Sequence, residues 1–413
     1  MWRQMKSSIR SGAWLTRERL TVYPLILLAA FVAAAAIWIA LADGLIDRTG
    51  QPIGTDFSNV WAAGKLALAG EPDAPYDIMR QHAAEKAAFG GRDVPIYGWH
   101  YPPMFLFAAA ALALLPYAWA LLAWTVLTLA AYLATLRAIL PAEETIRETM
   151  LLALAFPAVF VNLGHGQNGF LTAALLGGGL VLLDARPILA GALFGLLAYK
   201  PQFGVLIPLV LVFTGRWRVT AAALATVLVA AAATVVVFGP KAWVAFADSS
   251  AFIRAVVLEA GGPGWEKIQS LFSAVRMWGG PIALAYTAQL ALALAVAASL
   301  VWLWRSAAAE ELKAAALACG CLLATPYVID YDFVVLAVAM AFFARYGLAH
   351  GFRDYEISVL AFAWTAPLVG RAVAGTIGLP LGLIAVTALY LLTLRRAAAE
   401  LAANTPKAEP ARA

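Results

Sequence analysis

Charged side chains are scarce in this chain of 413 residues. Asp, Glu, Lys and Arg together make up 13% of it, whereas hydrophobic residues make up 63%. The mean hydropathy of +0.81 lies far outside the range of soluble globular proteins. The composition therefore excludes a soluble globular protein.

Cysteine is almost absent, with two residues in the whole chain. Cys319 and Cys321 lie two positions apart on an expected helix, so their side chains point to different sides and cannot easily bridge each other. We expect both thiols to be free and to serve packing.

The sequence also has no recognisable cleavable leader and no mark of a second, soluble domain. Five basic residues precede the first apolar run, but this run is about 20 residues long and no compelling small-residue cleavage site follows it, so we interpret it as an uncleaved first span. We expect residues 1–396 to form a single membrane domain. Residues 397–413, rich in Ala, Glu, Pro and Lys, are expected to be a disordered cytoplasmic tail.

Long apolar runs are what the chain does have, from residues 21–42 through to 377–394. A bilayer core of about 30 Å needs roughly 20 apolar residues per helix, and backbone inside lipid must be helical. We therefore expect an all-α polytopic membrane protein with 11 to 13 membrane segments.

The formal net charge is +5, and the basic residues cluster at the ends of the apolar runs. This placement is typical of the positive-inside bias and lipid headgroups, and it argues against a nucleic-acid partner. It predicts that both termini are cytoplasmic. The connections expected on the outer side are residues 43–100, 163–168, 200–202, 239–280 and 326–332, with a short turn near 373.

The apolar segments 101–115, 117–139 and 149–163 follow one another between two connections that are both expected on the outer side, 43–100 and 163–168. Three full crossings would end on the inner side, so these segments cannot all be full crossings. A helix of about 15 residues reaches only about 22 Å. We expect 101–115 or 149–163 to be re-entrant or a short, broken span.

Polar side chains at membrane depth are costly, and they are candidates for function. In this chain they gather at the outer ends of separate segments: Asp56, His100, Tyr101, His165, Gln167, Asn168, Lys200, Gln202, Tyr327, Asp330 and Asp332. Separated stretches thus converge on one face of the membrane.

Each stretch also has an ordinary explanation. A carboxylate in a loop, such as Asp56, is more often solvated than catalytic. Lys200, before a proline that breaks its helix, can snorkel to the interface or bind a phosphate. The run "GHGQNGF" at 164–170 can simply cap a helix, or offer donors to an anion and to sugar hydroxyls. The aromatics of "WHYPPMFLF" at 99–107 are ordinary interface residues that can also stack on a sugar ring.

The run "TPYVIDYD" at 325–332 places two carboxylates two residues apart. Paired carboxylates suit a hard cation, but no third and fourth ligand is evident nearby. Hydrogen bonds from Asp330 and Asp332 to hydroxyls or to Lys200 are the favoured interpretation.

Together these stretches resemble one family. Asp56–Phe57, "AGKL" and "YD" occupy the first outer loop, followed by "YPP" at 101–103, "GQN" at 166–168, "LAGALFGLLAYKP" at 189–201 and "TPYVIDYD" at 325–332. Their order and spacing, over roughly residues 50–345, are similar to glycosyltransferase family 87, the polyprenol-phosphate-mannose-dependent mannosyltransferases and their relatives in the GT-C superfamily. The late motif of the family often reads Asp-His-His, whereas this chain has Asp330, Tyr331 and Asp332.

The resemblance implies a GT-C-type membrane enzyme that takes a sugar, mannose or another hexose or pentose, from a polyprenyl-phosphate carrier. The acceptor is the hydroxyl of a glycan or glycolipid at the outer face, and the anomeric centre is inverted. Asp56 matches the position of the acidic residue that serves as catalytic base in the superfamily. Lys200, His165 and Gln167 are assigned to the donor phosphate, and the sugar and acceptor are assigned to Asn168, His100, Tyr101, Gln202, Tyr327, Asp330 and Asp332. No cofactor and no metal are expected, because a single phosphate needs less charge compensation than a pyrophosphate.

Three alternatives stay open at this stage. A lipid or glycan transporter would also use many spans, although the halves of the chain show no convincing repeat. A structural or assembly factor would use every polar group as a cap or an interface residue. An outer-face enzyme with a pyrophosphate donor is the third. The hydrophobic composition favours a bacterial inner membrane.

Overall fold

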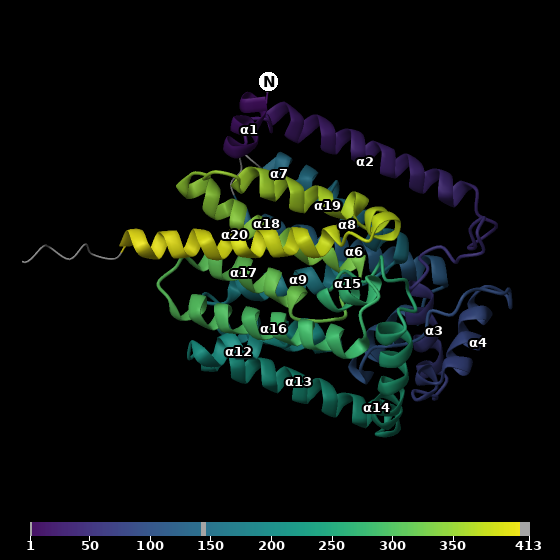
Figure 1. Cartoon of the computed structure of the whole chain (residues 1–413). Coiled ribbons are helices and arrows are strands. Elements are labelled where there is room, and N and C mark those ends of the chain that lie inside the picture. Colours follow the sequence, from purple (N-terminus) through teal and green to yellow (C-terminus); the bar gives the residue numbers. More distant parts are fainter. Residues whose placement is uncertain (1, 142–145, 405–413) are drawn as a thin grey trace, which may run out of the picture.

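The computed structural model describes residues 2–141 and 146–404, and within these ranges the chain is helical with no strand (Figure 1). Seven helices in this part are long and apolar enough to cross a membrane. The expected all-α polytopic fold is therefore confirmed. The seven spans are α2 (Arg17–Ala40), α6 (Tyr117–Ile139), α13 (Trp217–Phe238), α16 (Ile282–Arg305), η6 with α18 (Asp330–Phe333 and Val334–His350), α19 (Glu356–Ile377) and α20 (Leu381–Asn404).

Several apolar segments are too short or too bent to count as full spans. Helices α7 (Ile146–Leu154) and α8 (Pro157–His165) form one such pair, bent by 48° where Pro157 starts the second helix. Four shorter apolar helices lie at Pro103–Ala113 (η2 and α5), Gly169–Leu182 (α9), Pro187–Tyr199 (α10 and η4) and Pro201–Phe213 (α11 and α12). Both segments that the sequence analysis expected to be re-entrant or short, 101–115 and 149–163, are thus short or broken. The expected 11 to 13 membrane segments are reached only when these short helices are counted.

The two long outer loops fold into short helices at one end of the bundle (Figure 1). The first loop forms α3 (Phe57–Leu68), η1 (Ala74–Tyr76) and α4 (Ile78–Ala88), and the second forms α14 (Lys241–Ile253), η5 (Arg254–Glu259) and α15 (Leu271–Met277). The loops touch, because the rings of Tyr76 and Phe246 pack edge to face with centroids 5.9 Å apart. Short helices from the two loops therefore cover one end of the membrane bundle.

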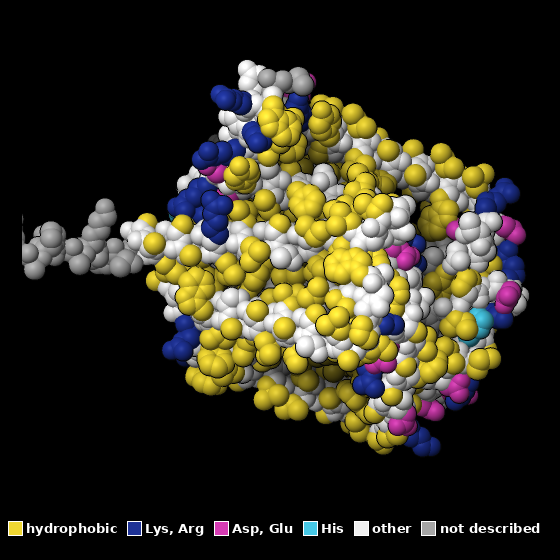
Figure 2. All heavy atoms as spheres, viewed as in Figure 1, with side chains coloured by type: hydrophobic (Ala, Val, Ile, Leu, Met, Phe, Trp, Pro, Cys, Tyr) yellow, Lys and Arg dark blue, Asp and Glu magenta, His cyan; other side chains and the backbone are white. Residues whose placement is uncertain are grey.

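The surface separates into an apolar belt and two polar ends. Figure 2 shows hydrophobic side chains over the middle of the molecule and Lys and Arg at both ends, whereas most visible acidic side chains lie over the two loops, away from the N-terminal helix α1 (Trp2–Ser11). Val236 of α13 is 84% exposed, as expected of a side chain that faces lipid. Acidic side chains therefore gather over the two loops, while basic side chains lie at both ends of the bundle.

The centre of the bundle is α17 (Glu310–Leu323) packed against α18, and most residues of both helices are buried. Cys319 and Cys321 lie in α17, buried and free, as the sequence predicted. Helix α20 continues past Arg396 to Asn404, so the expected boundary of a disordered tail at 397 is wrong for residues 397–404. Arg396 is buried there and pairs with Glu356 at 3.0 Å, which anchors this helix end to α19. The rest of the expected tail, 405–413, lies outside the described residues.

Candidate active site

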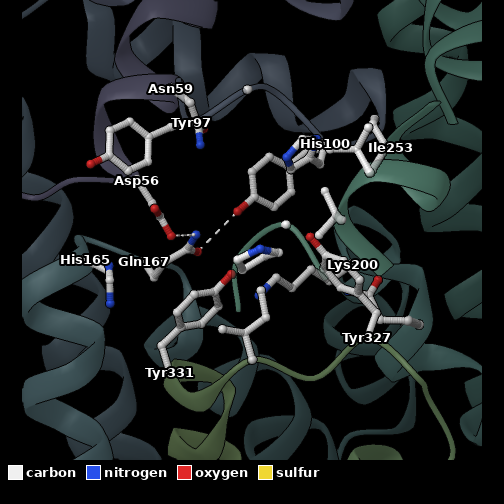
Figure 3. A pocket seen from close by; sticks show the side chains of 18 of the residues that line it. Asp56, Asn59, Tyr97, His100, His165, Gln167, Lys200, Ile253, Tyr327 and Tyr331 are labelled. Atoms are coloured by element: carbon white, nitrogen blue, oxygen red, sulfur yellow. Dashed lines mark hydrogen bonds between the residues drawn. The ribbon is translucent and has the colours of Figure 1, made fainter. Parts of the chain in front are cut away.

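A cavity of about 550 Å³ lies between the bundle and the two outer loops (Figure 3). Its walls come from the start of α3, residues 96–102, the turn after α8, residues 199–202, the α14–η5 helix, and residues 262–267 and 327–331. Most residues proposed from the sequence line it: Asp56, His100, Tyr101, His165, Gln167, Lys200, Gln202, Tyr327 and Asp330. Segments that lie far apart in the chain therefore do converge on one space.

Asp56 precedes the first residue of α3, and its carboxylate makes no cap hydrogen bond to the helix. Instead Oδ2 accepts a hydrogen bond of 2.8 Å from Nε2 of Gln167. The neighbouring Thr55 hydroxyl lies 2.8 Å from Nδ1 of His165. The first outer loop is thus held against the turn after α8 by two side-chain contacts, and these contacts aim the carboxylate into the cavity.

Gly166 allows this close approach. It ends α8 in the left-handed conformation, with φ of +58°, and a Cβ added there would lie 2.7 Å from the Cβ of Phe57. Such a contact is shorter than real Cβ atoms tolerate. Glycine therefore satisfies both the backbone conformation and the contact between the α8 turn and the start of α3.

A second layer of hydrogen bonds supports this turn. Oε1 of Gln167 accepts from the Tyr101 hydroxyl at 3.2 Å, and Nδ2 of Asn168 donates to the same hydroxyl at 2.8 Å. Asn168 is buried and does not line the cavity, so it orients Tyr101 rather than facing the substrate space. The sugar contact expected at Asn168 stays a prediction, with the side chain placed behind Tyr101.

Lys200 lies where the proline that follows it interrupts the helix between η4 and α11. Its ammonium donates to Oδ1 of Asp332 at 2.7 Å, and both side chains are 5% exposed or less. Oδ2 of Asp332 accepts the backbone N–H of Ile329 at 3.0 Å. The structure thus forms the pairing to Lys200 that the sequence favoured for the late motif, but Asp332 stands behind the wall and not in the cavity. The substrate contact expected of Asp332 stays a prediction, with its carboxylate engaged by Lys200.

The second outer loop is attached to the late motif by main-chain bonds. The N–H of Asp330 donates to the carbonyl of Lys267 at 3.0 Å, and the N–H of Gln269 donates to the carbonyl of Val328 at 2.8 Å. Lys267 lines the cavity, and no ion pair of its side chain is found within the described ranges. The cavity therefore has a second lysine that the sequence analysis missed.

Burial controls two ionisable groups of the first loop. Desolvation lowers the pKa of His100 to about 4, so its imidazole is neutral near pH 7 and can both donate and accept a hydrogen bond. Desolvation also raises the pKa of Glu85 to about 7. The two Glu85 oxygens accept the backbone N–H groups of Tyr97 and Gly98, each at 3.2 Å. Glu85 thereby fixes the segment that leads into His100.

The opposite wall is apolar and comes from the second loop. It consists of Phe246, Phe252, Ile253, Val256 and Val257. Residues 254–259 form a widened turn of π-helix, a feature that is frequent at functional sites. Little in the sequence indicates this wall, because its residues have the pattern of an ordinary apolar helix in a loop.

No group of three or more His, Cys, Asp or Glu side chains in the described parts of the chain is arranged to hold a metal ion. The ionic groups that line the cavity are instead two carboxylates, Asp56 and Asp330, and two lysines, Lys200 and Lys267. This arrangement suits proton transfer and the binding of an anion.

Comparison with known proteins agrees with this chemistry. The sequence model of glycosyltransferase family 87 matches residues 99–326, more than half of the chain. This range includes His100, Tyr101, His165, Gln167 and Lys200, whereas Asp56 lies before it. No curated protein and no solved structure matches the chain.

Proposed function

Because the chain belongs to glycosyltransferase family 87 and is therefore a membrane glycosyltransferase, we propose that it uses a polyprenyl-phosphate sugar as donor. The sugar, mannose or another hexose or pentose, passes to a hydroxyl of a glycan or glycolipid. The reaction takes place at the outer face of the bacterial inner membrane, and both termini lie in the cytoplasm.

The observation that carries this proposal is that a carboxylate and two lysines share one cavity at the loop-covered end of the bundle. A lipid-linked donor keeps its tail in the bilayer and brings its sugar and phosphate to the surface, where a hydrophilic acceptor can meet them. The apolar wall of α14 and η5 beside these ionic groups gives the first prenyl units a surface to pack on.

In the proposed reaction Asp56 is the general base. Gln167 donates a hydrogen bond to Oδ2 of Asp56, and no hydrogen bond to Oδ1 of Asp56 is found in the described residues. Oδ1 is therefore available to the acceptor. It takes the hydroxyl proton as the acceptor oxygen attacks the anomeric carbon. The bond from that carbon to the phosphate oxygen breaks, and the electron pair leaves with the phosphate. Attack opposite to the phosphate inverts the anomeric centre.

The leaving phosphate needs charge stabilisation rather than an acid. Asp332 already compensates the charge of Lys200 in an ion pair, whereas Lys267 forms no ion pair in the described residues, although Asp330 lies near enough to interact with it electrostatically. We therefore place the phosphate between Lys200 and Lys267, with His165 and Gln167 beside it. The neutral His100 and the Tyr101 and Tyr327 rings then border the sugar and the acceptor.

The proposal is tested with the purified full-length chain in lipid nanodiscs. It is incubated with polyprenyl-phosphate mannose, glucose, galactose or arabinose and with an alkyl glycoside acceptor, and release of polyprenyl phosphate is measured. Release that depends on the acceptor, with an inverted linkage in the product by NMR, is the expected result. Turnover with polyprenyl-pyrophosphate sugars alone would contradict it.

A further inference from the structure

Asn59 lies one helical turn after Asp56, on the same side of α3, and faces the same cavity (Figure 3). Its side chain is 4% exposed. Its Oδ1 is buried and has no hydrogen-bond partner. A buried amide without partners is unfavourable, and the large majority of buried side-chain polar atoms have a hydrogen-bond partner.

Within the described residues, the Asn59 side chain makes no hydrogen bond that would stabilise the fold. The backbone carbonyl of Asn59 accepts a hydrogen bond of 2.9 Å from Nε2 of Gln81, which fixes α3 against α4. No hydrogen bond of the Asn59 side chain is found among the described residues. Any residue with a backbone carbonyl could make the contact to Gln81, so the amide itself needs another explanation.

We propose that Asn59 binds a sugar hydroxyl next to the one that reacts at Asp56. This inference rests on the proposed glycosyl transfer. A carboxamide has two donor hydrogens and one acceptor oxygen, so it can pair with a hydroxyl in both directions. Residues three apart on a helix are neighbours, with Cβ atoms about 5 to 6 Å apart. Asp56 and Asn59 therefore bind neighbouring hydroxyls of one ring, and Asn59 is a positioning and specificity residue.

The test compares Asn59→Ala with Ser58→Ala. Ser58 is also fully buried, and its Oγ also lacks a partner, but it does not line the cavity. Asn59→Ala should lower kcat/KM by about tenfold, the effect of one unpaired hydroxyl. It should leave the unfolding midpoint unchanged or higher, because no internal hydrogen bond is lost. Ser58→Ala should leave both unchanged.

Deoxy substrates identify the ring that Asn59 reads. If it reads the donor, a deoxy donor slows the wild type by about tenfold and Asn59→Ala much less. If it reads the acceptor, the same pattern appears with a deoxy alkyl mannoside. The acceptor pattern supports the proposal, because the hydroxyl that reacts at Asp56 belongs to the acceptor, whereas the donor pattern would overturn it. Equal penalties in the wild type and the variant for every deoxy position of both rings would overturn it.

A binding measurement separates this inference from the proposed reaction. Affinities of wild type and Asn59→Ala are measured for polyprenyl-phosphate mannose, bare polyprenyl phosphate and octyl mannoside, without turnover. Weaker binding of octyl mannoside, with unchanged binding of bare polyprenyl phosphate, supports the inference. Unchanged binding of all three would refute it, even if transfer activity is found. Weaker binding of bare polyprenyl phosphate as well would also count against it.

Discussion

Asp56 and Gln167, 111 positions apart in the chain, are joined by a hydrogen bond of 2.8 Å at the mouth of the bundle. The carboxylate belongs to the first outer loop and the amide to the turn after a bent membrane segment. The contact brings the proposed base into the part of the chain that the family model matches. The geometry of the site therefore depends on how this turn and the first loop meet.

The first prediction concerns Asp56 itself. Asp56→Asn keeps an oxygen for the Gln167 bond but removes the base, so transfer should fall by about 10² to 10⁴-fold with the unfolding midpoint almost unchanged. The rate is measured as acceptor-dependent release of polyprenyl phosphate. Asp93→Asn is the control, because Asp93 belongs to the same loop and its side chain is 89% exposed. Full activity of Asp56→Asn would remove this residue as the base.

The second prediction concerns the glycine that permits the contact. Gly166→Ala places a Cβ in the left-handed region and 2.7 Å from Phe57. The backbone alone should cost about 1 to 2 kcal/mol in the free energy of unfolding. Because Asp56 is displaced from Gln167, transfer should fall as well.

Gly164→Ala is the matched control for Gly166→Ala. Gly164 lies inside α8, and an added Cβ would meet nothing within 4 Å. Alanine favours a helix over glycine by about 1 kcal/mol, so this variant should be as stable as the wild type or more stable. Equal effects of the two substitutions would show that the close approach to Phe57 is unimportant.

The sequence was sufficient to predict which segments meet. Proline and glycine breaks in apolar runs mark where a helix leaves the membrane, and the polar residues at these breaks, such as Lys200 and Gln167, share one cavity. The short or broken segments around 101–115 and 149–163 also followed from length alone. These features are local, so a single sequence carries them.

The sequence did not predict which side chains face the cavity and which lie behind its lining. Asp332 and Asn168 look like site residues, yet they stand behind Lys200 and Tyr101 because packing of distant helices decides which side faces the cavity. Glu85 and Lys267 read as ordinary loop charges, because their burial and position depend on how the two loops fold over the bundle. Asn59 alone had a local signal, its spacing of three residues from Asp56.

The third prediction concerns the buried pair of Lys200 and Asp332. Asp332→Asn keeps an acceptor for the Ile329 N–H but leaves the buried ammonium without its counter-charge. Breaking a buried pair in this way costs about 3 to 5 kcal/mol. Adding Lys200→Met removes the stranded charge, so the double variant should regain stability but not transfer. Unfolding midpoints in detergent give the comparison, and a double variant no more stable than Asp332→Asn would contradict the coupling.

The fourth prediction assigns the phosphate contact. Lys267→Gln should raise the donor KM and weaken inhibition by polyprenyl phosphate, each by about tenfold, because one charge-assisted hydrogen bond is lost. The change in kcat should be smaller. Lys241→Gln is the control, since Lys241 lies exposed at the first residue of α14 in the same loop. Unchanged inhibition of Lys267→Gln by polyprenyl phosphate would exclude the contact.

The fifth prediction concerns pH and Glu85. Burial raises its pKa from the ordinary 4.5 to about 7 in the folded protein. Proton binding therefore favours the folded state. The stabilisation is fully present below pH 4.5 and is lost as the pH rises through 7, with a total of the order of 3 kcal/mol. Glu85→Gln stays neutral and should remove this slope between pH 4.5 and 8.

The pH test follows the unfolding midpoint of the full-length chain across that range. Glu71→Gln is the control, because Glu71 lies in the same loop and its side chain is 50% exposed in a pair with Arg80. Since Glu85 holds the backbone of Tyr97 and Gly98, hydrogen exchange of residues 96–101, corrected for the intrinsic rate, should slow in Glu85→Gln relative to wild type at pH 8. At pH 8 the wild type must keep a charged carboxylate buried, whereas the variant does not. If hydrogen exchange in the wild type is as slow as in Glu85→Gln at pH 8, the Glu85 carboxylate is not the group that titrates.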